Sequence, residues 1–210
     1  MVESTREMID YLENLLQQRR KEPREDLFSA MAANDLEDAA IVANAMVLLV
    51  AGHETTRNLM GSCLSLLLRN PDQLERLRGD MTLLPRAVEE TLRMEPANPI
   101  MARLIAEDFE YQGAALQKGQ LLFLGIGSAN RDPEFVADPE RFDIGRKPGK
   151  HLGFGSGPHF CIGSILAKRE ATIALRELLT RFPNLRSNGP EEWTTQAGMR
   201  GPLRLPVALQ

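Results

Sequence analysis

One very long helical pattern constrains this fold more than any other feature of the sequence. It covers about residues 36–68, where Asp35 is expected to cap it and Asn70-Pro71 ends it. At about 1.5 Å per residue, such a helix is about 50 Å long, which exceeds the width of a small domain. Its first half, residues 39–50, is apolar on nearly every face and therefore requires neighbours on every side.

The remaining elements are shorter and indicate a mainly helical chain. Four more helical patterns cover residues 6–20, 26–33, 83–94 and 162–182. Pro71 opens a further helix at a favourable first-turn position. Residues 100–126 alternate short β-like runs with glycines, and the tail around Leu203 predicts a terminal hairpin or edge strand. No repeat or linker divides the sequence, so we expect a single domain over 1–210, mainly α with small antiparallel β-sheets.

Charge and composition exclude several classes of protein. The net charge of −4 provides no general basic field for nucleic acid. Two cysteines, Cys63 and Cys161, are too far apart for a CxxC site and too few for a disulfide scaffold. No apolar leader opens the sequence, and its most apolar stretch, residues 39–52, is shorter than the ~20 residues of a membrane span. We therefore expect a cytoplasmic protein that does not span a membrane.

Reactive chemistry is expected at Cys161, which lies in the glycine-rich segment 151–163 directly before a predicted helix. Unpaired N–H groups at a helix N-terminus favour a thiolate, so Cys161 is expected to be an anion or a metal ligand. Gly157 and Gly163 leave space for a flat, bulky group, and a single thiolate beneath such a group suits an axial haem ligand. A lone cysteine is also often buried and inert. This segment alone leaves the two interpretations about even.

Four segments, in order, resemble the motifs of the cytochrome P450 family. The pattern FxxGxxxCxG, which starts at Phe154, resembles the family's haem-binding signature. Residues 51–56 (AGHETT) are similar to the oxygen-activating segment, residues 90–93 (ETLR) match the ExxR pair, and residues 139–142 (PERF) match the PERF element. Four motifs in this order are very specific. The resemblance covers roughly residues 36 to 207 and implies the C-terminal, haem-binding half of the cytochrome P450 fold, of the bacterial soluble type.

The resemblance assigns a set of residues to the haem, iron protoporphyrin IX. Cys161 would be the ligand of the iron, and its electron-rich sulfur would favour cleavage of the O–O bond. Phe154 would pack against the sulfur side, and backbone N–H groups around Gly163 would tune the sulfur. The other haem-binding positions are Gly157, His159 and Arg103, the last two as propionate contacts. A surface salt bridge with Glu107 or Asp108 is the alternative for Arg103.

The resemblance also implies a catalytic acid–alcohol pair in the long helix. Thr55 would offer its hydroxyl during oxygen activation, and Glu54 would relay protons from water. Gly52 costs about 1 kcal/mol relative to alanine in a helix interior, which makes sense if the helix bulges there to admit dioxygen. A threonine that bonds back to the preceding turn would, however, kink any helix. His53-Glu54 also begins a zinc-protease HExxH pattern, but Arg57 stands where the second histidine would be.

Glu90, Arg93 and Arg141 resemble the family's buried charge triad. Each charge alone would be costly to bury, so the three should form one closed network. This network would fix the geometry of the Cys161 loop without taking part in the chemistry. An exposed i,i+3 ion pair is the alternative for Glu90 and Arg93, and only Arg141 argues against it.

The segment 141–181 is basic in an otherwise acidic chain. It holds eight Lys and Arg residues against three acidic ones, a net charge of +5. Such a face suits an acidic docking partner, and the resemblance implies a ferredoxin-like electron donor near Cys161. A solvated helix face with a few internal salt bridges is the alternative.

Family members also carry an N-terminal half, which supplies the lid of the substrate pocket and has no counterpart in this sequence. We therefore expect residues 39–50 to present an apolar face without a partner in the chain and to drive self-association into a homo-oligomer. Water on the distal side of the haem would impair coupled oxidation. The sequence thus predicts a haem-thiolate monooxygenase that oxidises a small organic substrate, impaired or altered by the missing half. The alternative is a non-catalytic haem-binding protein, a sensor or a remnant.

Overall fold

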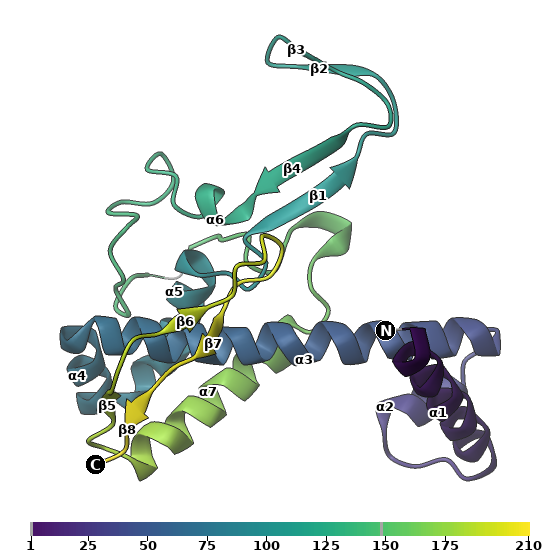
Figure 1. The fold of residues 1–210 in the computed structure, drawn as a ribbon, viewed down its shortest axis with the longest axis horizontal. Coiled ribbons are helices and arrows are strands. Elements are labelled where there is room, and N and C mark those ends of the chain that lie inside the picture. Colours follow the sequence, from purple (N-terminus) through teal and green to yellow (C-terminus); the bar gives the residue numbers. More distant parts are fainter. Residues whose placement is uncertain (1, 148) are drawn as a thin grey trace. The chain divides into compact units, whose positions relative to one another are not determined.

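The computed structural model describes residues 2–147 and 149–210, which fall into two compact units, Met1–Glu54 and Thr55–Gln210 (Figure 1). Each unit has a hydrophobic core of its own, and the long helix α3 (Asp38–Arg69) contributes residues to both cores. The predicted central helix is therefore present. It begins where the Glu37 carbonyl accepts the N–H groups of Ala40 and Ile41. Asp35 lies before this first turn, so the prediction that Asp35 caps the helix is wrong.

The smaller unit is built from α1 (Val2–Lys21), α2 (Leu27–Ala32) and the first part of α3. Asp26 caps α2, since its side chain accepts the Ser29 N–H at 2.7 Å and the Arg19 Nε–H at 2.7 Å. These hydrogen bonds lower the pKa of Asp26 to about 2. The small core is made by six buried residues from the three helices: Leu12, Leu16, Ala32, Ile41, Val42 and Ala45.

The apolar first part of α3 is buried on one side only. Ile41, Val42 and Ala45 lie in the small core, whereas Val47 and Val50 are 64% and 65% exposed. Among the residues that the structure describes, this segment therefore presents the exposed apolar face that was expected, and that the face lacks a partner stays a prediction.

Helix α3 is also long and apolar enough, by length and composition alone, to cross a membrane, and 22% of its most apolar window is buried. The buried central helix of a protein without membrane spans meets the same criteria. In its second half, Ser62 and Ser65 are completely buried beside the core residues Leu66 and Leu67. Burial against protein rather than lipid fits a core helix better than a membrane span.

The core of the larger unit lies among helices. The second half of α3 is followed by α4 (Pro71–Gly79), a short 3₁₀ helix η1 (Met81–Leu83) and α5 (Leu84–Met94). Helix α7 (Ser164–Arg181) packs against α5. Shorter pieces are α6 (Ile126–Ala129) and the 3₁₀ helix η2 (Gly157–His159). The predicted helix boundaries are confirmed to within two residues for α5 and α7, because Pro85 and Pro96 delimit α5 and Gly163 precedes α7.

The strands form four small antiparallel sheets of two strands each. The pairs are β1 (Ile100–Leu104) with β4 (Leu121–Gly125), β2 (Phe109–Tyr111) with β3 (Ala114–Leu116), β5 (Arg186–Ser187) with β8 (Val207–Ala208), and β6 (Glu192–Trp193) with β7 (Pro202–Arg204). The β2–β3 hairpin extends the β1–β4 ribbon at its far end (Figure 1). The fold is mainly α with small antiparallel sheets, as predicted. The last two strands pair with earlier strands and do not form a hairpin with each other.

Candidate haem-binding site around Cys161

The Cys161 loop is closed by backbone hydrogen bonds directly before α7. The Cys161 N–H donates to the Phe154 carbonyl at 2.9 Å, and the Phe160 N–H donates to the Gly157 carbonyl at 3.0 Å. The Ser164 N–H donates to the Cys161 carbonyl at 3.2 Å, which leads the chain into α7. Gly157 has φ +67°, a left-handed conformation that favours glycine. The loop therefore has a defined shape that holds Cys161 two residues ahead of the helix cap, Gly163.

Gly153 allows this loop to approach α5. A Cβ atom at Gly153 would lie 2.7 Å from the Leu92 carbonyl oxygen, which is a backbone atom of α5 and cannot swing away. The loop also reaches α5 through Asn130, whose Oδ1 accepts the Leu152 N–H at 2.7 Å and whose Nδ2 donates to the Leu92 carbonyl at 3.3 Å. The entrance of the loop is thus fixed against the end of α5.

We expect Gly153→Ala to destabilise the larger unit, because the new methyl group forces the loop away from α5. Overpacking of this kind costs about 1–3 kcal/mol of unfolding free energy. Gly149→Ala is the matched control, since a Cβ there meets nothing within 4 Å. Urea unfolding of both variants would measure the difference, and equal midpoints would show that the contact with Leu92 does not hold the loop.

Several residues close to Cys161 in the chain are apolar and open to solvent. Phe160 is 56% exposed, Ile162 is 90% exposed and Leu166, on the first turn of α7, is 62% exposed. The Cys161 side chain is partly buried and forms no disulfide. An open, apolar surface around a single sulfur suits a large flat ligand that would cover these residues.

The donor set fits a haem better than a metal ion held by the protein alone. Among the described residues, no group of three or more His, Cys, Asp or Glu side chains could hold a metal ion. A single thiolate therefore suits an iron that brings its own four nitrogen ligands in a porphyrin. Cys63 is not a candidate ligand of the iron, because it is completely buried and desolvation raises the pKa of its thiol to about 12.

Glu90 and Arg93, both on α5, form a buried ion pair. Their side chains are 4% and 6% exposed, and two parallel bonds of 2.8 Å join the Arg93 guanidinium to the Glu90 carboxylate. Arg93 also donates to the carbonyls of Pro139 at 2.7 Å, Asn130 at 3.2 Å and Arg141 at 3.3 Å. This pair holds the irregular segment after α6 against α5, and the exposed ion-pair alternative is excluded.

The second arginine of the network is Arg146, and the prediction that the Arg141 side chain joins it is wrong. Arg146 Nε lies 3.0 Å from Glu90 Oε1, and its guanidinium donates to the carbonyls of Ala137, Asp138 and Arg141. The Arg141 side chain is exposed and forms none of these hydrogen bonds. A turn through Asp143 brings residue 146 back toward Glu90, and that turn leaves only the backbone of residue 141 inside the network.

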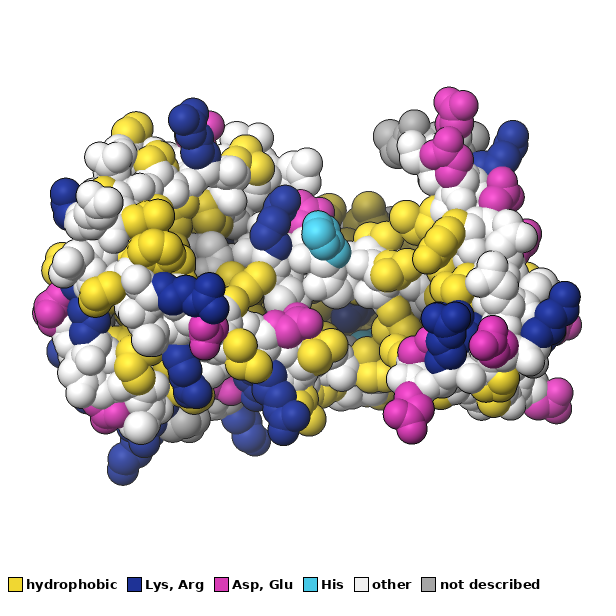
Figure 2. Space-filling model, turned by 90° about the horizontal axis from the view of Figure 1, so that it is seen from below, with side chains coloured by type: hydrophobic (Ala, Val, Ile, Leu, Met, Phe, Trp, Pro, Cys, Tyr) yellow, Lys and Arg dark blue, Asp and Glu magenta, His cyan; other side chains and the backbone are white. Residues whose placement is uncertain are grey.

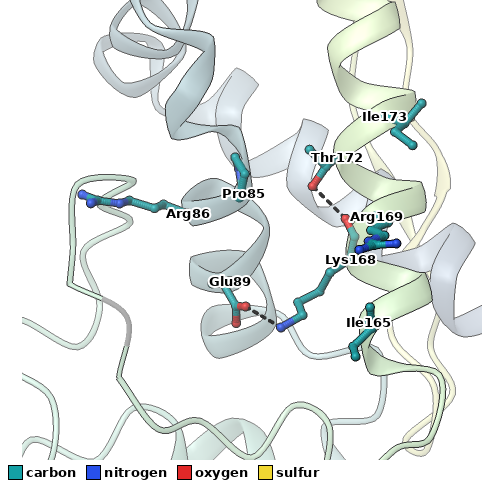
Figure 3. Close-up of a pocket in the computed structure, with 8 residues that line it drawn as sticks. All are labelled: Pro85, Arg86, Glu89, Ile165, Lys168, Arg169, Thr172 and Ile173. Carbon is teal, nitrogen blue, oxygen red and sulfur yellow. Dashed lines mark hydrogen bonds and ion pairs between the residues drawn. The ribbon is translucent and has the colours of Figure 1, made fainter.

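Glu89, one residue before Glu90, holds a second charged cluster that the sequence analysis missed. Glu89 Oε1 accepts from Lys168 Nζ at 2.9 Å (Figure 3). The other carboxylate oxygen, Oε2, lies 2.9 Å from His151 Nε2. The hydrogen bond with His151, followed by the one with Lys168, lowers the pKa of Glu89 to about 2. Glu89 also lines a cavity of about 480 Å³ between α5 and α7, whose wall includes Ile165 and Ile173. Glu89 and Glu90 are consecutive in α5, and consecutive side chains of a helix point in different directions. The sequence could therefore have indicated that Glu89 has partners other than those of Glu90.

The remaining predicted residues lie apart from these hydrogen bonds. His159 ends η2 and is exposed, and Arg103 is exposed on β1, where it donates to the Ala102 carbonyl at 2.9 Å. Glu54 and Thr55 are consecutive residues of α3, at the division between the two units. Helix α3 is a continuous α-helix through this region, so the predicted bulge at Gly52 is absent from the structure: glycine permits such a bulge but does not impose it.

The basic segment lies partly on the face of the larger unit that α7 forms. Figure 2, which views this face from below, shows Lys and Arg side chains among exposed hydrophobic ones. Three of the eight cations are paired, Arg146 with Glu90, Lys168 with Glu89 and Arg181 with Glu177. Within the described part of the chain, Arg169 and Arg176 of α7 are exposed and form no ion pair.

Comparison with known proteins places these features in a family. The family model described as Cytochrome P450 matches residues 1–206. The chain is 46% identical over 209 residues to Cytochrome P450 107B1 of Saccharopolyspora erythraea, with 95% of this chain and 52% of that protein covered. It is 40% identical to 6-deoxyerythronolide B hydroxylase of the same organism, with 99% and 54% covered. The chain thus spans about half the length of the curated relatives that it matches.

Solved structures agree with the sequence comparison. The chain superposes on the Bacillus subtilis bacillaene polyketide synthase cytochrome P450 PksS with a TM-score of 0.94 at 39% identity, covering 97% of this chain and 55% of that one. It superposes on CYP109E1 from Bacillus megaterium, solved in complex with testosterone, with a TM-score of 0.95 at 33% identity, covering 98% and 59%. The helices and small sheets described above therefore have the arrangement of about half of these larger proteins.

Proposed function

The chain belongs to the cytochrome P450 family, and from this premise we propose that it binds haem through the Cys161 thiolate and takes part in the monooxygenation of a small organic substrate. The observation that carries this proposal is the Cys161 loop. A single partly buried thiol lies in a loop that carries exposed apolar residues and is closed by the hydrogen bond from the Cys161 N–H to the Phe154 carbonyl. A bound haem would supply the iron chemistry of dioxygen activation.

The side chains of this loop have distinct tasks in the proposal. Cys161 holds the iron, while Ile162 and Leu166 cover apolar parts of the macrocycle that would otherwise be hydrated. A Cβ atom at Gly163 would lie 3.9 Å from Cys161 Sγ, so glycine leaves the surroundings of the sulfur open. His159 and Arg103 are cationic or polar groups open to solvent, as contacts for propionate carboxylates require. Gly157 and Phe154 give the loop its turn and its packing.

Glu54 and Thr55 are proposed as the groups that move protons. A carboxylate followed by an alcohol can take a proton from water and deliver it through the hydroxyl of Thr55. If the protein binds haem but serves as a sensor, the Thr55 hydroxyl has no such task. Thr55→Ala therefore separates the two functions: an oxygenase should lose coupled product formation by about 10²-fold, whereas haem binding should be unaffected in both cases.

The reduced, carbon monoxide-bound spectrum tests the proposal directly. A haem ligated by thiolate gives the red-shifted band that is typical of the family, and we expect this band from the purified protein loaded with haem. A spectrum of a histidine- or thiol-ligated haem, or no haem uptake at all, would contradict the proposal. The measurement requires no knowledge of the substrate.

An acidic electron donor of the ferredoxin type is proposed to dock on the basic face of α7. Arg169 and Arg176 would carry the attraction, because Lys168 and Arg146 are engaged with Glu89 and Glu90. We also propose a cytoplasmic location and self-association through Val47, Leu49 and Val50. Light scattering that finds a monomer at micromolar concentration would contradict the self-association.

A further inference from the structure

We propose that Glu89 and His151 are positioning residues for the Cys161 thiolate, which they reach through a chain of three hydrogen bonds from α5. This inference rests on the proposed haem-thiolate function. Glu89 and His151 are not members of the hydrogen-bonded Glu90–Arg93–Arg146 network described above.

The first two bonds of the chain meet at the His151 ring. The Gly153 N–H donates to His151 Nδ1 at 3.1 Å, so Nδ1 carries no proton. With Nδ1 as the acceptor, Nε2 is the ring nitrogen that faces Glu89 Oε2, at 2.9 Å, and can donate to it. Both ring nitrogens are occupied, and the ring connects a carboxylate of α5 to the backbone of the loop. A single tautomer and a single ring orientation satisfy both bonds.

The third bond reaches the proposed ligand itself. Phe154 follows Gly153, and its carbonyl accepts the Cys161 N–H at 2.9 Å. The Phe154 ring is held from two sides, with the His151 ring centroid at 6.3 Å and the Lys168 ammonium 6.0 Å above its face. Lys168 is bound in turn to the other oxygen of Glu89 (Figure 3). A displacement of Glu89 or His151 therefore moves the residue that holds Cys161.

The partial burial of Glu89 and His151 indicates a fixed contact within the fold and not a transient contact at the surface. The side chains of His151 and Glu89 are 12% and 30% exposed. Glu89 lies in the walls of two cavities beside α5, and His151 lies in the wall of one of these two. Partners that orient a metal ligand from the second layer commonly change metal affinity by about 10–100-fold when they are removed. An effect of this kind is expected here on the haem.

The test uses the full chain loaded with haem. In His151→Phe, which keeps a ring beside Phe154 but loses both hydrogen bonds, we expect haem to dissociate about tenfold faster. A smaller share of the reduced carbon monoxide complex should show the thiolate band. Glu89→Gln keeps an oxygen that can accept from Nε2, so its effect should have the same direction and be smaller. Glu177→Gln is the matched control, because it removes the same charge from an exposed ion pair with Arg181 on α7.

The possible outcomes separate the inference from the proposed function. A wild-type protein without the thiolate band would contradict the function. A wild-type protein with the band, and a His151→Phe variant with the same share of thiolate complex and the same rate of haem loss, would overturn the positioning role alone. A variant that unfolds at lower temperature while its folded fraction keeps the full thiolate band would also overturn it, since His151 would then only stabilise the fold. If His151→Phe does not fold, Glu89→Gln against Glu177→Gln decides the question.

Discussion

Replacement of Cys161 by serine is expected to abolish the thiolate band of the reduced, carbon monoxide-bound protein. A serine hydroxyl at this position cannot supply the electron-rich sulfur that gives the band its position. Haem would bind more weakly or through another ligand, and any coupled oxidation would be lost. Absorption spectra and haem titration of the variant measure both effects.

Two further readouts show whether this loss is specific to the ligand. Cys161 is only partly buried, so the unfolding free energy of the haem-free protein should change by less than about 0.5 kcal/mol. Cys63→Ala is the control: this cysteine is completely buried in the core of the larger unit, and the variant should be less stable but keep the band. A Cys161→Ser protein that retains the thiolate band would contradict the assignment of the ligand.

The sequence allowed the helical framework to be predicted, because local signals delimit each helix. Asn70-Pro71 separates α3 from α4, and Pro96 follows the end of α5. The start of α3 was predicted to within two residues, but its cap was assigned wrongly: Asp35 offered a capping side chain, whereas the helix begins after Glu37. Boundaries of this kind depend on how the preceding turn packs, which the sequence does not encode locally.

Some contacts of the candidate site could be predicted from the sequence, whereas others could not. Contacts between residues close in the sequence, such as Glu90 with Arg93 or Phe154 with Cys161, could be predicted because the spacing of the residues indicates which of them meet. The roles of Arg146, Asn130 and His151 depend on where an irregular segment returns to α5. This irregular segment has no periodic pattern, so its sequence does not show which of its residues come to lie against α5. Sequence reasoning therefore placed a cation in the network but chose the wrong arginine.

The corrected network leads to the second large effect, which is expected in Arg146→Ala. Removal of this guanidinium leaves Glu90 with one cation fewer in a buried position, and three backbone carbonyls lose a donor. Breaking one side of a buried ion pair costs about 3–5 kcal/mol, and we expect a value near the lower limit because Arg146 is 21% exposed. Urea unfolding of the purified protein measures this loss.

Arg141→Ala provides the matched comparison, since it removes the same side chain five residues earlier in the same segment. The Arg141 side chain is exposed, while the atom that enters the network is its backbone carbonyl, which alanine retains. The loss of unfolding free energy should therefore stay below about 1 kcal/mol. If Arg141→Ala were the more damaging variant, the Arg141 side chain would have to reach Glu90, and the assignment of Arg146 would be wrong. Because both variants keep Glu90 and Arg93, the difference between them isolates the second arginine of the network.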